Sequence, residues 1–148
     1  PARRSVRVAC VALQDPRSSK PRFIVVRRAE GTLLAGTWSL PEAEITGATN
    51  HLAAAHQALA RAGLAADVID LVGEVRQIFT HRDVTAFVSR AQTETPPPAH
   101  QRRWVDPRAL SRLAVSSFAK KTLALAVRES STRRVRRVDR RTLDCSAA

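Results

Sequence analysis

The segment Thr-His-Arg-Asp at residues 80–83 combines side chains that recognise polar and anionic surfaces. A threonine hydroxyl both donates and accepts hydrogen bonds, a histidine ring offers two nitrogens, and arginine binds phosphate through paired donors. On either side, residues 74–79 and 84–89 alternate between apolar and polar types, which predicts two strands. Because so few residues separate the strands, we expect a β-hairpin whose tip presents these side chains directly after Phe79.

Each residue at this tip also has an ordinary structural interpretation. An apolar side chain at a strand end, such as Phe79, is more often part of a core than of a binding surface. A lone threonine like Thr80 is usually a turn residue, and a lone histidine like His81 is usually a surface residue. From these residues alone, a binding loop and a plain turn are both open.

The charge of the chain indicates a polyanionic partner. Its 148 residues carry a formal net charge of +12, with 25 Lys and Arg against 13 Asp and Glu. Nucleic acids and anionic membranes both attract such surfaces, although many surface cations only solvate a face. The weak candidates for phosphate contact are Arg76, Arg82, Arg90, Arg102, Arg103, Lys120 and Lys121.

Composition argues against a metal site and a membrane span. The two cysteines, Cys10 and Cys145, are too few for a four-cysteine zinc or iron–sulfur site within the chain. No apolar run approaches the roughly 20 residues of a membrane helix. Free cysteines fit a reducing compartment, so we expect an intracellular protein of the cytoplasm, nucleoid or nucleus. The lack of methionine and the start at Pro1 favour a domain of a longer protein.

The order of the expected elements predicts the fold class. A first helix is expected after Thr49 or Asn50 and should end near Ala62, with Gly63 just past its end. Strand, strand, helix, strands and helix in this order predict an α+β domain with a mixed or antiparallel sheet flanked by helices. The expected strands are residues 6–13, 23–28, 74–79, 84–89 and 101–105, and a last helix is expected from Ser116 or Ser117 to Val127.

Helical spacing predicts which side chains face the core. A stripe of apolar residues three or four positions apart should lie against the sheet. The expected core residues of the two helices are Leu52, Ala55, Leu59, Ala62, Phe118, Leu123 and Val127. The first two strands are expected to pair antiparallel across the short turn at residues 15–21.

Two segments resemble known proteins. Residues 33–41, Leu-Leu-Ala-Gly-Thr-Trp-Ser-Leu-Pro, are similar to the segment that leads into the signature helix of Nudix-fold proteins. Residues 73–81, Gly-Glu-Val-Arg-Gln-Ile-Phe-Thr-His, resemble the C-terminal Nudix-like domain of MutY-type adenine DNA glycosylases. In that family a strand ends in a Phe-Ser-His or Phe-Thr-His loop. Trp104 and residues 117–121 fit the end of the same domain, so the resemblance covers roughly residues 5–127.

The expected signature helix lacks the acids of Nudix hydrolases. Nudix hydrolases resemble one another in a pattern that begins and ends with glycine and contains an arginine and four carboxylates. When its last glycine is placed on Gly63, the first glycine falls on Glu42 and the arginine on His56. Mg²⁺ prefers carboxylate oxygens, and phosphoanhydride hydrolysis relies on it. No Asp or Glu occurs in residues 46–65, so we expect no metal, no catalytic residue and no hydrolysis from this chain. The four carboxylate positions of the pattern hold Ala48, Gln57, Ala60 and Arg61.

The resemblance to MutY-type enzymes implies a DNA recognition module. In that family the N-terminal domain excises adenine opposite 8-oxoguanine, and the C-terminal domain helps to recognise the oxidised base. By this resemblance Thr80 would lie against the oxidised base, with Phe79, His81 and Arg82 around it. The implied partners are double-stranded DNA containing 8-oxoguanine opposite adenine and the N-terminal glycosylase domain. No cofactor is implied here, because the iron–sulfur cluster of the family belongs to its catalytic domain.

The chain is expected to divide into a Nudix-like domain at residues 1–128 and a basic, flexible tail at residues 129–148. Residues 133–148 hold six Arg and two Asp, so the remainder still carries a net +8. Such a tail can add nucleic-acid affinity that falls with salt, act as a targeting signal or touch a membrane surface. The sequence leaves its role open.

Two other functions stay open at this stage. A divergent Nudix hydrolase of nucleoside diphosphate derivatives would have to use acids outside the signature helix, such as Glu42, Glu44 or Glu74. A Nudix-fold scaffold that binds RNA or a ribonucleoprotein would also suit the basic tail. Magnesium-dependent turnover would favour the hydrolase, and equal affinity for any RNA or DNA would favour the scaffold.

Overall fold

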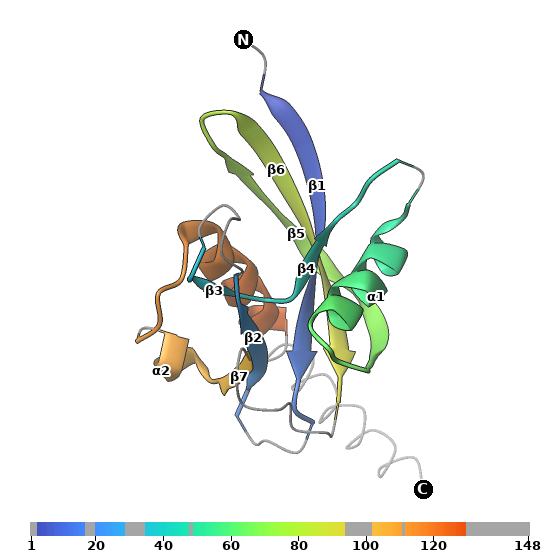
Figure 1. The fold of residues 1–148 in the computed structure, drawn as a ribbon. Coiled ribbons are helices and arrows are strands. Elements are labelled where there is room, and N and C mark those ends of the chain that lie inside the picture. Colours follow the sequence, from blue (N-terminus) through green and yellow to red (C-terminus); the bar gives the residue numbers. More distant parts are fainter. Residues whose placement is uncertain are drawn as a thin grey trace, which may run out of the picture.

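The chain folds into one mixed sheet with helices on both faces (Figure 1). The computed structural model describes residues 3–16, 20–28, 35–47, 49–93, 102–110 and 112–129. Its strands are β1 (Arg4–Gln14), β2 (Phe23–Arg27), β3 (Trp38–Ser39), β4 (Glu42–Glu44), β5 (Asp67–Ile78), β6 (Arg82–Gln92) and β7 (Arg102–Val105). Its helices are α1 (His51–Arg61), the short α2 (Pro107–Leu110) and a helix over residues 117–129, here called the C-terminal helix. The predicted α+β class with a flanked, mixed sheet is confirmed.

β1 organises the sheet. It pairs in parallel with β6 along its whole length, from Arg4 beside Arg82 to Gln14 beside Gln92. β6 pairs antiparallel with β5, which ends this path through the sheet. On the other side, β1 pairs with β4, and β2 pairs with β3 and β7, all antiparallel. The predicted antiparallel pairing of the first two strands is present but reduced to Gln14 and Phe23, because β4 pairs with Val8–Cys10 on the same edge of β1.

Two cores lie on opposite faces of the sheet. Successive side chains of a strand point to opposite faces, so neighbouring residues of β1 enter different cores. Cys10 belongs to the core that the C-terminal helix closes with Phe118 and Leu123. Val11 and Leu13 belong to the core under α1. The two helices therefore sandwich β1.

α1 begins and ends where predicted and buries Ala55 and Leu59 of the predicted stripe, but not Leu52. The Asn50 side chain accepts a hydrogen bond from the Ala53 N–H at 2.8 Å, and Gly63 follows the helix with φ +68°. The prediction that Leu52 faces the core was wrong, because its side chain is 45% exposed. Small side chains let the helix approach the sheet closely, so the alanine-rich stripe packs inward. The buried residues are Ala54, Ala55, Ala58 and Leu59.

β5 is longer than the strand predicted for residues 74–79. It runs through Gly73, where a Cβ atom would lie 3.0 Å from a methyl group of Leu125 on the C-terminal helix. Two register shifts interrupt its pairing with β6, one between Val68 and Asp70 and one just before Gly73. Such bulges bend a strand and increase its twist. Glycine at this position lets the helix lie directly on the strand.

The C-terminal helix begins at the predicted cap. The Ser116 hydroxyl accepts a hydrogen bond from the Ala119 N–H at 3.1 Å, satisfying one free donor of the first turn. Phe118 and Leu123 are buried, as predicted, and Val127 is half-buried. Within the described ranges, no helix is long and apolar enough to cross a membrane. The expected tail from residue 130 onward lies outside the described residues.

Candidate nucleic-acid interface

The predicted loop, residues 79–81, joins β5 to β6 at the end of the sheet where β1 begins (Figure 1). The Phe79 N–H donates to the Arg82 carbonyl at 2.7 Å and closes the hairpin. From β1, the Arg4 N–H donates to the His81 carbonyl at 3.0 Å, and the Arg3 guanidinium donates to the Phe79 carbonyl at 3.0 Å. The loop backbone is therefore held both from within the hairpin and from the neighbouring strand.

The four predicted recognition residues divide into one anchor and three presented side chains. Phe79 is half-buried and packs against the core beneath the C-terminal helix. Its ring meets that of Phe118 edge-on, with centroids 6.1 Å apart and an interplanar angle of 67°. Thr80, His81 and Arg82 are exposed. The packing of Phe79 therefore favours a role in the core.

An arginine–carboxylate pair clamps the base of the hairpin. Nε and Nη2 of Arg76 donate to the two carboxylate oxygens of Asp83 at 2.8 and 2.5 Å. These hydrogen bonds hold the pKa of the Asp83 carboxyl below its usual range. Arg76 was a predicted phosphate contact, and its guanidinium is directed to Asp83.

The start of the C-terminal helix adjoins the loop. Besides the contact between Phe118 and Phe79, the Gln77 amide of β5 donates to the Ser117 hydroxyl at 3.1 Å. Lys120 and Lys121 follow one turn later, and both are exposed. The structure thus brings two predicted phosphate contacts to the same end of the molecule as the loop.

Arg103 lies on the same face of the sheet as the C-terminal helix. Its guanidinium sits over the ring of Trp38, 5.0 Å from the ring centroid, a distance typical of a cation–π contact. The backbone N–H of Trp38 donates to the Ala114 carbonyl at 2.9 Å, in the segment that enters the helix. This aromatic support was missed, although Trp38 stands within the segment that resembles the Nudix pattern.

Two other predicted phosphate contacts have internal partners. Nη1 of Arg102 donates to the carbonyls of Ala62 and Gly63, at 2.5 and 3.0 Å, and so holds the end of α1. Nε of Arg90 donates to Asp70 at 3.2 Å, and the Arg90 side chain is 12% exposed. These two cations lie apart from the loop and stabilise neighbouring elements.

Comparison with known families matches residues 11–125 to the NUDIX domain. The chain belongs to the Nudix family. No curated protein sequence matches this Nudix domain.

Solved structures similar to this Nudix domain include the C-terminal domain of mouse MUTYH, determined in complex with human PCNA. The identity is 25% over 82% of this chain and 87% of that chain, with a TM-score of 0.66. MutT protein from Methanosarcina mazei Go1 is 16% identical over 88% of this chain and 98% of that one, with a TM-score of 0.73. C. elegans Ap4A hydrolase is 12% identical over 86% of this chain and 97% of that chain, with a TM-score of 0.63. The Nudix fold is therefore shared with the MUTYH domain and with hydrolases.

The signature helix of this Nudix domain does not fit the magnesium ion that hydrolases of the fold use. Ala48 lies outside the described residues, and the other three carboxylate positions carry neutral or cationic side chains on the exposed face of α1. A cation at such a position would repel Mg²⁺. In the described part of the chain, no three His, Cys, Asp or Glu residues are grouped to hold a metal. The exposed residues at these positions are Gln57, Ala60 and Arg61.

The acids that a divergent hydrolase would need are dispersed. Glu42 forms an ion pair with Arg28, and its carboxylate lies 3.8 Å from the Cys10 sulfur. Burial, followed by the charge of Glu42, raises the pKa of the Cys10 thiol, which therefore stays neutral. Glu44 is ion-paired with β1 at 3.3 Å, and Glu74 is exposed on the edge strand β5. These carboxylates do not converge on a common centre.

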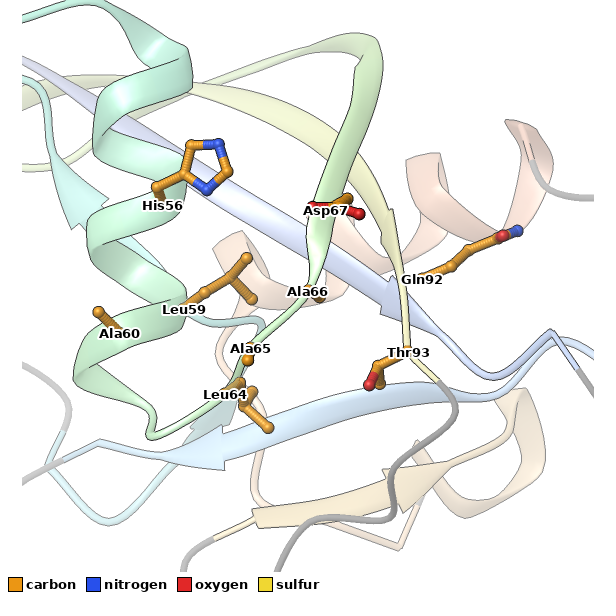
Figure 2. A pocket seen from close by; sticks show the side chains of 9 residues that line it. All are labelled: His56, Leu59, Ala60, Leu64, Ala65, Ala66, Asp67, Gln92 and Thr93. Atoms are coloured by element: carbon orange, nitrogen blue, oxygen red, sulfur yellow. The ribbon is translucent and has the colours of Figure 1, made fainter.

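A pocket of about 580 Å³ opens between α1 and the first residue of β5 (Figure 2). Leu59 and Leu64 give it apolar walls, and Asp67 contributes its one carboxylate. No Lys or Arg of the described ranges lines it. Asp67 and the loop stand at opposite ends of β5, so this pocket is separate from the candidate interface around the loop.

Proposed function

We propose that this Nudix domain is the recognition module of an adenine DNA glycosylase and has no hydrolytic activity of its own. It binds double-stranded DNA at 8-oxoguanine opposite adenine and works beside an N-terminal glycosylase domain. The loop carries this proposal: its backbone is fixed by three hydrogen bonds, Phe79 anchors it, and Thr80, His81 and Arg82 are left exposed.

The chemistry of Thr80 suits an oxidised guanine. 8-Oxoguanine differs from guanine by an additional acceptor at O8 and by a donor instead of an acceptor at N7. A hydroxyl group can serve either atom, because it both donates and accepts. A loop already held in place loses little conformational freedom on binding, which favours affinity and discrimination.

The cations around the loop supply the part of the affinity that does not depend on sequence. Arg82 begins β6 directly after the loop, and Lys120 and Lys121 belong to the helix whose Phe118 contacts Phe79. Arg103 adds a further cation on the same face of the sheet. Contacts to phosphate orient the duplex, and the loop then reads the base.

Fluorescence-anisotropy titrations of the full chain test the proposal. One duplex contains 8-oxoguanine opposite adenine, and the other has guanine at the same position. We expect tighter binding of the oxidised duplex at low salt and a preference that persists as salt rises. Equal binding that vanishes with salt, or equal binding of RNA, would contradict recognition. Turnover of nucleoside triphosphates in Mg²⁺ would contradict the absence of hydrolysis.

A further inference from the structure

The pocket beside α1 has the wrong chemistry for the ligand of the loop. Among the residues that the structure describes, no Lys or Arg lines it, whereas Asp67 places a carboxylate at its edge. A carboxylate repels phosphate, and none of the described residues around the pocket is a cation that could compensate. The leucine and alanine walls favour an apolar group instead. His56, Gln92 and Thr93 supply a few polar contacts around these walls (Figure 2).

The strand that leaves this pocket is the outer strand of its sheet. β5 pairs with β6 on one side, and no strand of the described ranges follows it in the sheet order. Such an edge presents backbone donors and acceptors to which an extended segment can add. Just beyond Asp67, the large apolar side chains of Ile69 and Leu71 are 46% and 40% exposed. Apolar contact area therefore continues from the pocket along the edge.

β5 is acidic from Asp67 to Val75, within a basic chain. Residues 67–75 hold three acids and no Lys or Arg, in a chain whose net charge is +12. Asp70 is ion-paired with Arg90, whereas the carboxylates of Asp67 and Glu74 form no ion pair or side-chain hydrogen bond among the described residues. The edge is thus complementary to a basic segment.

The two bulges limit what can pair with this edge. Register shifts at Val68/Asp70 and Leu71/Gly73 break the regular spacing of its outward N–H and C=O groups. Bulges of this kind protect edges against long pairing with a second copy. A short segment of a few residues does not need a continuous ladder.

We propose that the pocket and the adjoining first half of β5 bind a short extended peptide of a partner protein. An apolar side chain of the peptide enters the pocket, and a neighbouring lysine or arginine lies beside Asp67. The site shares no residue with the loop, so peptide binding can be tested independently of DNA recognition.

Two synthetic peptides test this site on the full chain. One is Ser-Arg-Val-Leu-Arg-Val-Ser, and its acidic twin has glutamate in place of both arginines. Backbone amide signals of the protein are followed by NMR during each titration. We expect the basic peptide to shift signals within residues 64–71 and the acidic peptide to bind at least about fivefold more weakly. Similar affinity for both peptides, or shifts confined to residues 79–82, would overturn the proposal.

Surface variants make the test specific. Asp67→Asn should weaken binding of the basic peptide about threefold, the usual effect of one exposed charge. Ile69→Ser should weaken it as well without disturbing the core, because Ile69 is 46% exposed. Glu44→Gln removes a carboxylate outside the site and should leave binding unchanged. If Asp67→Asn does not weaken binding of the basic peptide, the proposal fails. It also fails if the signals of β5 shift with the concentration of the chain alone, because a second copy then occupies the edge.

Discussion

The ring of Phe118, in the first turn of the C-terminal helix, packs edge-on against the ring of Phe79 with 6.1 Å between centroids. One contact therefore joins the loop to the helix that carries Lys120 and Lys121. Base-reading and phosphate-binding groups, which lie about 40 residues apart in the chain, are thereby held in a fixed relation. The geometry of the proposed interface depends on this part of the core.

Replacing Phe79 by alanine should affect both stability and recognition. Loss of a fully buried phenylalanine costs about 3–5 kcal/mol, so for this half-buried ring we expect about 1–3 kcal/mol. The loop also loses its anchor, which should reduce the preference for 8-oxoguanine. Urea unfolding and duplex titrations measure the two effects. Phe79→Leu is the control, because it retains apolar volume and should lose less of both. Full recognition by the alanine variant would show that the anchor is unnecessary.

Replacing Thr80 by alanine should separate recognition from stability. Thr80 is exposed, so its removal should change the free energy of unfolding by less than about 0.5 kcal/mol. Without its hydroxyl at the base edge, discrimination between oxidised and plain duplexes should fall by on the order of 1–3 kcal/mol. Thr80→Ser keeps the hydroxyl and should keep the preference. If alanine leaves the affinity ratio of the two duplexes unchanged, the loop assignment is wrong.

Replacing either lysine of the C-terminal helix by alanine should weaken DNA binding without destabilising the domain. Cations near a helix N-terminus oppose its dipole, so Lys120→Ala should stabilise the domain by a few tenths of a kcal/mol. The same change should weaken duplex binding and reduce the salt slope by about 0.9 for each phosphate that the protein no longer neutralises. Lys121→Ala should act on binding in the same way.

Arg61→Ala is the matched control for the lysine variants. Arg61 lies in the last turn of α1, where a cation favours the dipole, and α1 covers the other face of the sheet. This variant should lose a little stability and keep its salt slope. An equal fall in slope for Arg61 and Lys120 would indicate that binding depends only on net charge.

Local features of the fold could be read from the sequence. Asn50 and Gly63 bracket α1 as their side-chain chemistry and backbone freedom predict, and the hairpin tip follows from two alternating segments. The buried stripe of α1 could not be read from helical spacing alone. Leu52 is exposed and the alanines are buried, because small side chains allow α1 to lie close to the sheet.

Long-range relations could not be read from the sequence. The parallel ladder of β1 and β6 joins segments about 78 residues apart, and neither strand carries a pattern that specifies its neighbour. The same holds for Arg102, whose partners Ala62 and Gly63 are 40 and 39 residues away. A cation in a basic sequence gives no sign of whether it faces phosphate or a helix end. The tertiary fold makes that choice.

The clamp between Arg76 and Asp83 should make stability depend on pH. Arg76 lowers the folded-state pKa of Asp83 below the value of about 3.9 expected in the unfolded chain. A lowered carboxyl pKa gives stability that is present above the unfolded-state pKa and is lost as pH falls through the folded-state value. Asp83→Asn should therefore be less stable than the natural chain near neutral pH, and the difference should shrink below about pH 4. Urea unfolding across this range measures it. A constant difference at all pH values would contradict an ionic clamp.

Arg102 distinguishes a structural cation from a phosphate contact. Its Nη1 atom satisfies the carbonyls of Ala62 and Gly63 at the end of α1, so Arg102→Met should destabilise the domain by about 1–2 kcal/mol. Arg102→Lys keeps the charge but loses the planar guanidinium, and it should destabilise nearly as much. Both variants should bind duplex DNA with the natural salt slope when measured under conditions where they are folded. If Arg102→Met lowers the slope by about 0.9 while Arg102→Lys does not, Arg102 contacts phosphate, and the interface extends to the face covered by α1.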